Sequence, residues 1–272
     1  MRLDRPMLLL LAGAVGCGPM ESREEDQPLE QGASRALAGT TLLSDGFEQY
    51  PTGGWPEGSA PGPWQVVFNG YGTVSVTSTT TGHALRERPA AATSPSETHA
   101  ALVVSKASFA DASVSLRVST RQQLRTPTPN AWEVGWVLWR YTDPDHFYYL
   151  ALKPNGWELG KRDPAYPGGQ RFLATGTDRR FAIGSWSSIG LELSGAKMTV
   201  SVGGSPLTTF TDFERPYASG AIGLYTEDAT VLFDDVLVKA PATASDAGTT
   251  KVADAGTAPV ADAGTPAGSD AG

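Results

Sequence analysis

Residues 132–161 combine aromatic and charged side chains at the spacing of β-strands. Eight aromatic residues fall within the first 26 positions of this stretch, with Glu, Lys and Arg between them. Aromatic rings can stack on the C–H faces of a sugar, while charged and amide side chains hold its hydroxyls. A hydrophobic core can show the same pattern. The stretch therefore indicates carbohydrate chemistry only if its polar side chains share an exposed face.

Alternation along the strand expected at residues 132–141 separates two sets of side chains. We assign to the core Trp132, Val134, Trp136, Leu138 and Arg140. We assign to the open face Glu133, Gly135, Val137, Trp139 and Tyr141. A three-residue connection at residues 143–145 would place the apolar set of the next strand, Tyr148, Leu150 and Leu152, on the core side.

The two flanking strands extend the predicted open face. A turn at Pro154 and Asn155 places Trp157 and Leu159 in the core. The strand at residues 112–125 alternates between inward Val114, Leu116 and Val118 and outward polar residues that include Arg117. We place it beside the strand at residues 132–141. The predicted ligand contacts are Arg121, Gln123, Glu133, Trp139, Tyr141, Tyr149, Lys153 and Glu158, with Arg171 at the rim.

The elements that carry these residues are predicted to be strands throughout. Residues 41–239 show short runs rich in Val, Thr, Leu, Tyr and Trp between Gly, Pro, Asn and Asp, and no stretch of helical periodicity. The expected strands are 41–47, 64–68, 73–79, 83–88, 98–105, 112–125, 132–141, 146–153, 156–161, 170–174, 187–193, 197–202, 207–211, 221–226 and 231–238. So many strands require two packed sheets, which predicts an all-β, two-sheet antiparallel sandwich of jelly-roll type.

The two ends of this region resemble the first and last strands of concanavalin A-like jelly rolls. The resemblance rests on residues 45–48 (DGFE), 220–225 (GAIGLY) and 229–238 (ATVLFDDVLV). This superfamily includes laminarinase-like glycoside hydrolases, laminin-G-like domains and the 3-keto-disaccharide hydrolase-like family. Its concave sheet binds glycans, so the resemblance implies a polysaccharide or oligosaccharide ligand on that sheet. It does not imply a particular reaction.

Three functions remain open for the predicted face. Non-catalytic glycan binding requires the fewest special geometries. A uronate lyase would use Arg121 or Gln123 to neutralise a carboxylate and Tyr149 or Lys153 to move protons. A glycoside hydrolase needs two carboxyl groups roughly 5–10 Å apart, but Glu133 and Glu158 are expected on the order of 16 Å apart. The E-x-D-x-x-E signature of laminarinase-like enzymes is also missing. The remaining alternative is a structural β-sandwich with no glycan ligand.

A second group of acidic residues lies where the first and last strands are expected to meet. Jelly-roll relatives often hold a structural Ca²⁺ there, which takes six to eight oxygen ligands. The resemblance makes Asp235 the first candidate ligand, followed by Asp45 or Glu48. Neighbouring residues of a strand point to opposite faces, so Asp234 and Asp235 can act together only at a bulge. No other cofactor is expected.

The ends of the chain predict export and anchoring. Residues 1–16 have the charged, apolar and small-residue regions of a secretory signal. Residues 14–17 resemble a bacterial lipobox, which implies lipidation of Cys17, the only cysteine; the alternative is an ordinary secretion signal with an incidental cysteine. Residues 17–39 are then the lipidated end and a flexible tether, 40–240 the sandwich, and 241–272 a disordered tail that repeats Asp-Ala-Gly.

These features predict a secreted protein that is lipid-anchored to the bacterial cell envelope. The only expected membrane contact is the lipid anchor, and the protein is expected to be a monomer. The chain has a net charge of -8 and no basic run, so nucleic acid is not an expected partner.

Overall fold

The computed structural model describes residues 39–241, which form strands in two sheets. One sheet contains β1 (Thr41–Asp45), β2 (Gly53–Trp55), β4 (Thr73–Thr79), β5 (Gly82–Arg88), β7 (Ala112–Gln123), β12 (Ser187–Ser194), β13 (Lys197–Val202), β14 (Ser205–Thr211) and β16 (Ala229–Lys239). The other contains β3 (Trp64–Phe68), β6 (Ala100–Ser105), β8 (Gly135–Asp143), β9 (His146–Lys153), β10 (Gly156–Arg162), β11 (Gln170–Gly176) and β15 (Ala221–Glu227). A short 3-10 turn, η1 (Pro167–Gly169), precedes β11.

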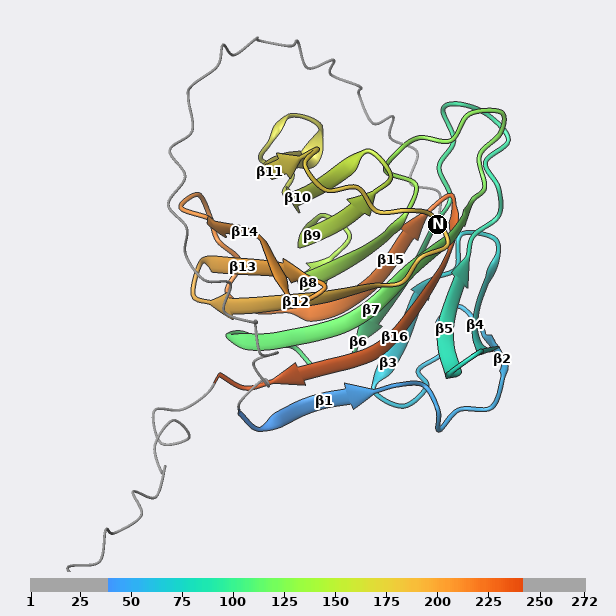
Figure 1. Ribbon diagram of the computed structural model, residues 1–272, viewed down its shortest axis with the longest axis horizontal. Helices are drawn as coiled ribbons and strands as arrows, with labels where there is room; N and C mark the ends of the chain where they lie inside the picture. The colour runs from blue at the N-terminus through green and yellow to red at the C-terminus, as the bar shows by residue number, and fades with distance from the viewer. Residues whose placement is uncertain (1–38, 242–272) are drawn as a thin grey trace, which may run out of the picture.

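The two sheets pack as the layers of an antiparallel sandwich (Figure 1). The nine-stranded sheet has the order β14-β13-β12-β7-β16-β5-β4-β2, with β1 paired to β16, and the seven-stranded sheet has the order β11-β10-β9-β8-β15-β6-β3. The predicted all-β, two-sheet jelly-roll sandwich is confirmed. Each expected strand is present, and β2 is the additional one. Its three residues include two glycines, so it has too little alternation to be recognised from sequence.

The main hydrophobic core lies between the sheets, because inward-facing residues of both sheets contribute to it. The predicted core residues found there are Val114, Leu116, Val118, Tyr148, Leu150, Leu152, Trp157 and Leu159. The predicted register of the β9–β10 hairpin is also correct: Leu150 pairs with Leu159, and Lys153 pairs with Gly156 at the turn. A tight turn determines which residues of its two strands face each other, which is why this register followed from local sequence.

The predicted faces of β8 are reversed in the structure. Val137 and Trp139 point into the core between the sheets. A second apolar cluster covers the outer face of the seven-stranded sheet, and it includes or packs against Trp132, Val134, Trp136 and Leu138. The assignment of these four residues to the central core was therefore wrong, as was the exposure expected for Trp139.

The length of the turn after β8 explains the reversal. Asp143 pairs with His146 across a two-residue turn, where the sequence suggested a three-residue connection. The pairing with β9 shifts between Trp139 and Asp143, and Arg140 has a positive φ of 51°. Residues 140–142 oppose Phe147 alone, and this bulge disrupts the alternation locally. Tyr141 consequently lies on the outer face although Trp139 lies in the core.

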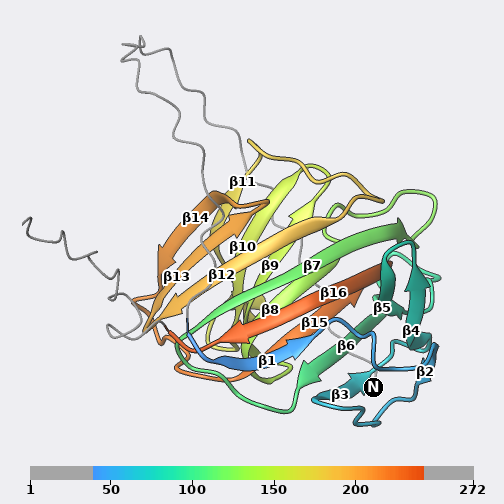
Figure 2. The ribbon, with the colours of Figure 1, turned by 60° about the horizontal axis from the view of Figure 1, so that its bottom comes forward.

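The predicted neighbour of β8 is also wrong. Strand β7 pairs with β12 and β16 in the nine-stranded sheet, whereas β8 pairs with β9 and β15 in the seven-stranded sheet. Figure 2 shows β12, β7 and β16 running side by side in one layer. The outward residues of β7 therefore cannot join those of β8 on one face. The connection between these consecutive strands crosses from one sheet to the other.

A buried ion pair lies between the sheets close to β14. Lys161 and Asp212 are both buried, with 2.9 Å between Nζ and Oδ2. Lys161 also donates to the carbonyl oxygens of Glu214 and Arg215, and Tyr148 donates to Asp212. Burial favours a raised pKa for Asp212, but the hydrogen bonds from Lys161 and Tyr148 outweigh it and lower that pKa. The pair is therefore fully hydrogen-bonded and structural.

The predictions for the ends of the chain lie outside the described residues. They comprise the signal segment, the lipidated Cys17, the tether up to residue 38 and the Asp-Ala-Gly tail from residue 242. Within residues 39–241, no helix is long and apolar enough to cross a membrane.

Candidate functional site

A continuous row of aromatic rings covers the outer face of the seven-stranded sheet. Its members are Phe68, Tyr225, Trp136, Tyr149, Phe147 and Tyr141. The closest pair is Trp136 and Tyr149, whose ring centroids are 4.5 Å apart at an interplanar angle of 26°. Adjacent strands bring these rings together, because Tyr225 pairs with Trp136 and Leu138 pairs with Tyr149. Stacked and tilted pairs of this kind make the face rigid.

A chain of polar side chains crosses β9, β10 and β11 beside this row. Lys153 Nζ donates to Glu158 Oε2, and Tyr149 Oη donates to Glu158 Oε1 at 3.3 Å. Gln170 Nε2 in turn donates to Tyr149 Oη. Glu158 pairs with Ala151, whose small side chain leaves room for Tyr149 and Lys153 to reach the carboxylate from either side. Donors and acceptors thus lie next to aromatic rings, which is the combination that a sugar requires.

The residues of this chain differ in their access to a ligand. Tyr149 is fully buried and Glu158 is nearly so, whereas the Lys153 side chain is 16% exposed and Gln170 is half-buried. Phe172 follows on β11, pairs with Gly160 on the same face and is 56% exposed. The accessible contacts are therefore Lys153, Gln170 and Phe172. Tyr149, which the sequence suggested as a stacking contact, instead supports them from below.

A second carboxylate lies at the β15 side of this face. Glu227 is half-buried, and its Oε1 accepts a hydrogen bond of 2.6 Å from Tyr225 Oη. Burial raises the pKa of Glu227 to about 7, and the nearby carboxylates Asp228 and Glu133 add to the shift. The Tyr225 hydrogen bond and Arg162 lower it only in part. Glu227 can therefore exchange a proton near neutral pH.

The other aromatic residues predicted as ligand contacts are inaccessible. Trp139 is fully buried in the central core, where its Nε1 donates to Sδ of Met198 at 3.3 Å. The prediction that Trp139 lies on an open face was wrong because the face of β8 is reversed. Tyr141 does lie on the outer face, but only 9% of it is exposed.

Glu133 is a buried structural residue. Arg125 binds Glu133 through Nε and Asp228 through Nη2, the latter at 2.7 Å. The Arg125 guanidinium also donates to the carbonyl oxygens of Ser94 and Glu97. This ion-pair network joins three loops at one end of the sandwich. Glu133 has no exposed surface, so the prediction that it contacts a ligand is not supported.

Arg121 and Gln123 lie at the end of β7, in the other sheet. Arg121 donates to the carbonyl oxygen of Gly184 at 3.0 Å. Gln123 donates to the carbonyl oxygen of Asn130, and Asn130 donates to Glu133. Both residues hold loops in place. The structure does not bring them together with Lys153 and Glu158, as the predicted sheet order required.

Arg171 lies on the side of β11 that faces away from the polar chain. It pairs with Lys161 across the strands and contacts Glu214 at 3.0 Å, while its guanidinium lies 5.2 Å from the ring centre of Tyr166. Asp212 of the buried ion pair is 3.9 Å away. Arg171 therefore extends that structural network, whereas its chain neighbours Gln170 and Phe172 face the aromatic row.

The three acids predicted to bind Ca²⁺ do not form one ligand set. Asp45 is buried and accepts hydrogen bonds from Phe47 N, Gln49 Nε2, Tyr50 Oη and Trp64 Nε1. Glu48 accepts from the backbone N of His83 at 2.8 Å. Asp235 has a positive φ of 51°, and Asp234 and Asp235 both bind Arg117, at 2.5 and 2.6 Å. Among residues 39–241, no group of three or more His, Cys, Asp or Glu side chains could hold a metal ion.

Sequence reasoning missed Gln170, Phe172 and Glu227. Gln170 and Phe172 occur two residues apart at the start of β11, so strand alternation alone would have placed them on one face. Glu227 follows Tyr225 by two residues at the end of β15. Its position next to the aromatic row depends on β15 lying between β6 and β8, which no local signal indicates.

No protein-family model and no curated protein matches this chain. A protein of unknown function with a galectin-like fold from Bacillus subtilis has a TM-score of 0.50 at 14% identity, covering 75% of this chain and 98% of that one. The carbohydrate-binding module CBM66 from Bacillus subtilis gives 0.47 at 16% identity, over 64% and 93%. A glycoside hydrolase family 16 endo-glucanase from Bacteroides ovatus gives 0.48 at 11% identity, over 72% and 99%. Identities this low show similarity of fold alone.

Proposed function

We propose that this protein binds a polysaccharide or oligosaccharide on the outer face of its seven-stranded sheet. The observation that carries the proposal is the hydrogen-bonded chain Lys153–Glu158–Tyr149–Gln170. Tyr149 of this chain also stacks on Trp136, and exposed Phe172 lies on the same face. A ligand on this face meets an aromatic surface at Phe172 and hydrogen-bonding groups at Lys153 and Gln170. Tyr149 and Glu158 hold those groups in position.

Substitution of Phe172 tests this proposal without disturbing the fold. Phe172→Ala should weaken binding of the full-length chain to its preferred neutral glycan about tenfold, as measured by calorimetry after screening a glycan panel. Phe213→Ala is the matched control, since Phe213 is 89% exposed in the loop after β14. Equal affinities of the wild type and Phe172→Ala, or no retention of any glycan, would reject the proposal.

Hydrolysis of the bound glycan is the second candidate function. Glu227 favours hydrolysis, because a carboxyl group with a pKa of about 7 can act as a general acid. The carboxylates of Glu158 and Glu227 both act electrostatically on Tyr149. Release of reducing ends, lost in Glu227→Gln but retained in Glu57→Gln, would identify a hydrolase. Binding without release leaves the protein a binding module.

The lyase alternative has less support. Arg121 and Gln123, the groups suggested for neutralising a uronate, lie in the other sheet. Burial, together with the nearby Glu158 carboxylate, raises the pKa of Tyr149 well above its ordinary value, so its phenolate is a poor choice as a base. A lyase would reveal itself by unsaturated uronate products absorbing in the ultraviolet.

We further propose that glycan binding takes place outside the cytoplasm, with the protein anchored through lipid on Cys17. The proposal is supported by residues 1–17, whose charged start, apolar run and small residues before the cysteine are typical of an exported lipoprotein. Metabolic labelling with palmitate should mark the wild type and not Cys17→Ser. Label in both proteins, or in neither, would reject the anchor.

A further inference from the structure

A second concave surface lies away from the aromatic row, next to the start of β12. It is a hollow of about 440 Å³ whose lining includes Arg179, Arg180, Trp186, Ser187 and Ser188. One wall is the segment that connects β11 to β12, and the other is the turn between β13 and β14. The hollow thus lies where β12 begins and β13 ends, in the nine-stranded sheet.

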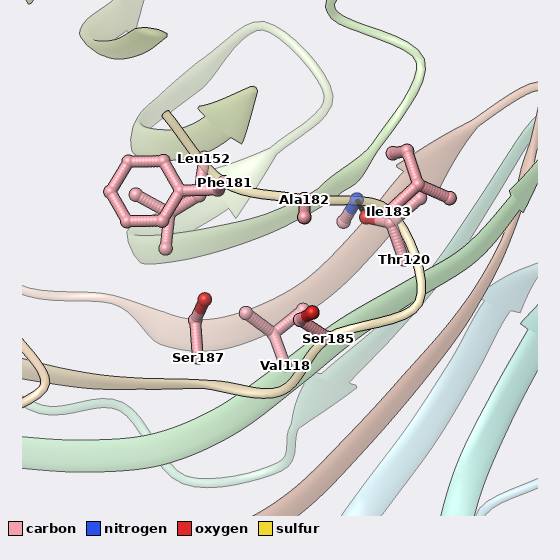
Figure 3. Close-up of a pocket in the computed structure, with 9 residues that line it drawn as sticks. Val118, Thr120, Leu152, Phe181, Ala182, Ile183, Ser185 and Ser187 are labelled. Atoms are coloured by element: carbon pink, nitrogen blue, oxygen red, sulfur yellow. Dashed lines mark hydrogen bonds between the residues drawn. The ribbon is translucent and has the colours of Figure 1, made fainter. Parts of the chain in front are cut away.

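The connecting segment is held firmly enough to form a permanent wall. Its backbone N–H groups at Phe181 and Gly184 donate to the carbonyl oxygens of Lys153 and Thr120, at 3.0 and 2.7 Å. Beneath it lies a gap with room for about one water molecule, shown in Figure 3 with Phe181 and Leu152 on one side and Val118 on the other. The two backbone hydrogen bonds hold the segment in place, and with it the side chains that it presents outward.

The hollow presents two guanidinium groups in different states. Arg179 donates to the carbonyl oxygen of Val202 at 3.0 Å and lies 5.7 Å from the ring centre of Phe181, so its position is fixed. Arg180 is exposed, and no carboxylate in residues 39–241 pairs with it. An arginine without a partner beside a fixed one provides donors for a planar anionic group, which guanidinium binds through paired hydrogen bonds.

The third component of the hollow is a positioned aromatic ring. Trp186 is half-buried, and the guanidinium carbon of Arg117 lies 5.0 Å from the centre of its ring. Arg117 is itself held by Asp234 and Asp235. Ser188 pairs with Arg117 on the outward face of β12 and also lines the hollow. A flat ring, a hydroxyl group and paired cations match a sugar ring that carries an anionic substituent.

We propose that this hollow is a second saccharide site, which binds an acidic sugar residue carrying a carboxylate or a sulfate. Arg180 and Arg179 bind the anionic oxygens, and Trp186 and Ser188 contact the ring. The attraction must be local, because the chain as a whole carries a net charge of -8 and repels polyanions at long range. The proposal is independent of glycan binding on the seven-stranded sheet, since no residue is shared.

Calorimetry of the full-length chain with oligogalacturonate and with a sulfated oligosaccharide tests the proposal. Methyl-esterified oligogalacturonate is the neutral control, since it has the same backbone without charge. The expected result is binding of one or both acidic ligands and loss of binding on esterification. Arg180→Gln should weaken acidic-ligand binding about tenfold. Binding of only one acidic ligand would identify the anionic group that the hollow prefers.

Arg88→Gln is the matched control, because Arg88 is exposed on β5, which is separated from β12 by β7 and β16. It should bind the acidic ligand as the wild type does. Equal weakening in Arg88→Gln and Arg180→Gln would overturn the proposal in favour of non-specific attraction, and so would a failure of both acidic ligands to bind. Acidic-ligand binding that is lost in Phe172→Ala but retained in Arg180→Gln would place the ligand on the seven-stranded sheet. That result would also overturn the proposal.

Discussion

The Tyr149 ring lies directly over Gly160 of the neighbouring strand. A β-carbon on Gly160 would sit 2.1 Å from Cζ of that ring, well inside van der Waals contact. Gly160 pairs with Tyr149 in the β9–β10 hairpin, and Tyr149 in turn stacks on Trp136. The absence of a side chain at position 160 therefore allows the aromatic row and the polar chain to meet.

Gly160→Ala should displace the Tyr149 ring and break its hydrogen bonds to Glu158 and Gln170. We expect a loss of about 1–3 kcal/mol in the free energy of unfolding, measured by urea denaturation, together with weaker glycan binding. Gly54→Ala is the control, because the nearest atom to a β-carbon at Gly54 is 4.0 Å away. Equal stabilities of the two variants would contradict the close contact.

Glu227 should make stability depend on pH below neutrality. Its pKa is raised from 4.5 to about 7 in the folded protein, so between these values the native state retains a proton that the unfolded chain releases. Stability contributed by this proton is complete below pH 4.5 and is lost as the pH rises to about 7. Urea denaturation at pH 5 and pH 7 measures how far the free energy of unfolding decreases between these values. The decrease should be smaller in Glu227→Gln than in the wild type, by on the order of 2 kcal/mol. Identical decreases in both proteins would show that Glu227 titrates normally.

Glu87 should add to the pH dependence of stability. It is fully buried among the inward residues of β5, and no described group donates a hydrogen bond of good geometry to either carboxylate oxygen. Burial raises its pKa well above the ordinary value, and the backbone of Val103 offsets this only in part. The native state therefore loses stability as the pH rises from the ordinary glutamate pKa through the raised one.

Glu87→Gln keeps the shape of the side chain and removes the charge. As the pH rises above the ordinary glutamate pKa, its free energy of unfolding should fall less than that of the wild type. Glu57→Gln, a change in the exposed loop before β3, serves as the control. The same decrease in free energy of unfolding in the wild type and in Glu87→Gln would mean that Glu87 has a partner or access to water.

Arg125 should be essential for the stability of the end of the sandwich that carries Glu227. Replacement by Met leaves Glu133 and Asp228 buried without their partner, and breaking a buried ion pair in this way costs about 3–5 kcal/mol. Thermal unfolding should show a large decrease in melting temperature for Arg125→Met. Arg121→Met, at an exposed position of β7, should change the melting temperature little. A small effect of Arg125→Met would contradict the structural role of the network.

Local pattern predicted the strands and one part of the candidate site. Tyr149, Lys153 and Glu158 were placed on one face because β9 and β10 form a hairpin around a short turn, and the structure brings these three side chains together. Their roles in ligand binding stay predictions. The same reasoning gave the reversed face for β8, because it assumed a three-residue connection where Asp143 pairs with His146 across a two-residue turn.

The sequence by itself determined that this protein is an all-β sandwich, because alternation and turn residues act within a few positions of the chain. Only the tertiary structure decided the order of the strands in the two sheets, beyond hairpins such as β9–β10. That choice placed Arg121 and Gln123 in one sheet and Lys153 and Glu158 in the other, and it brought Glu227 beside the aromatic row. Sheet order depends on how distant segments bury their apolar faces together, so neighbouring residues in the chain carry little information about it.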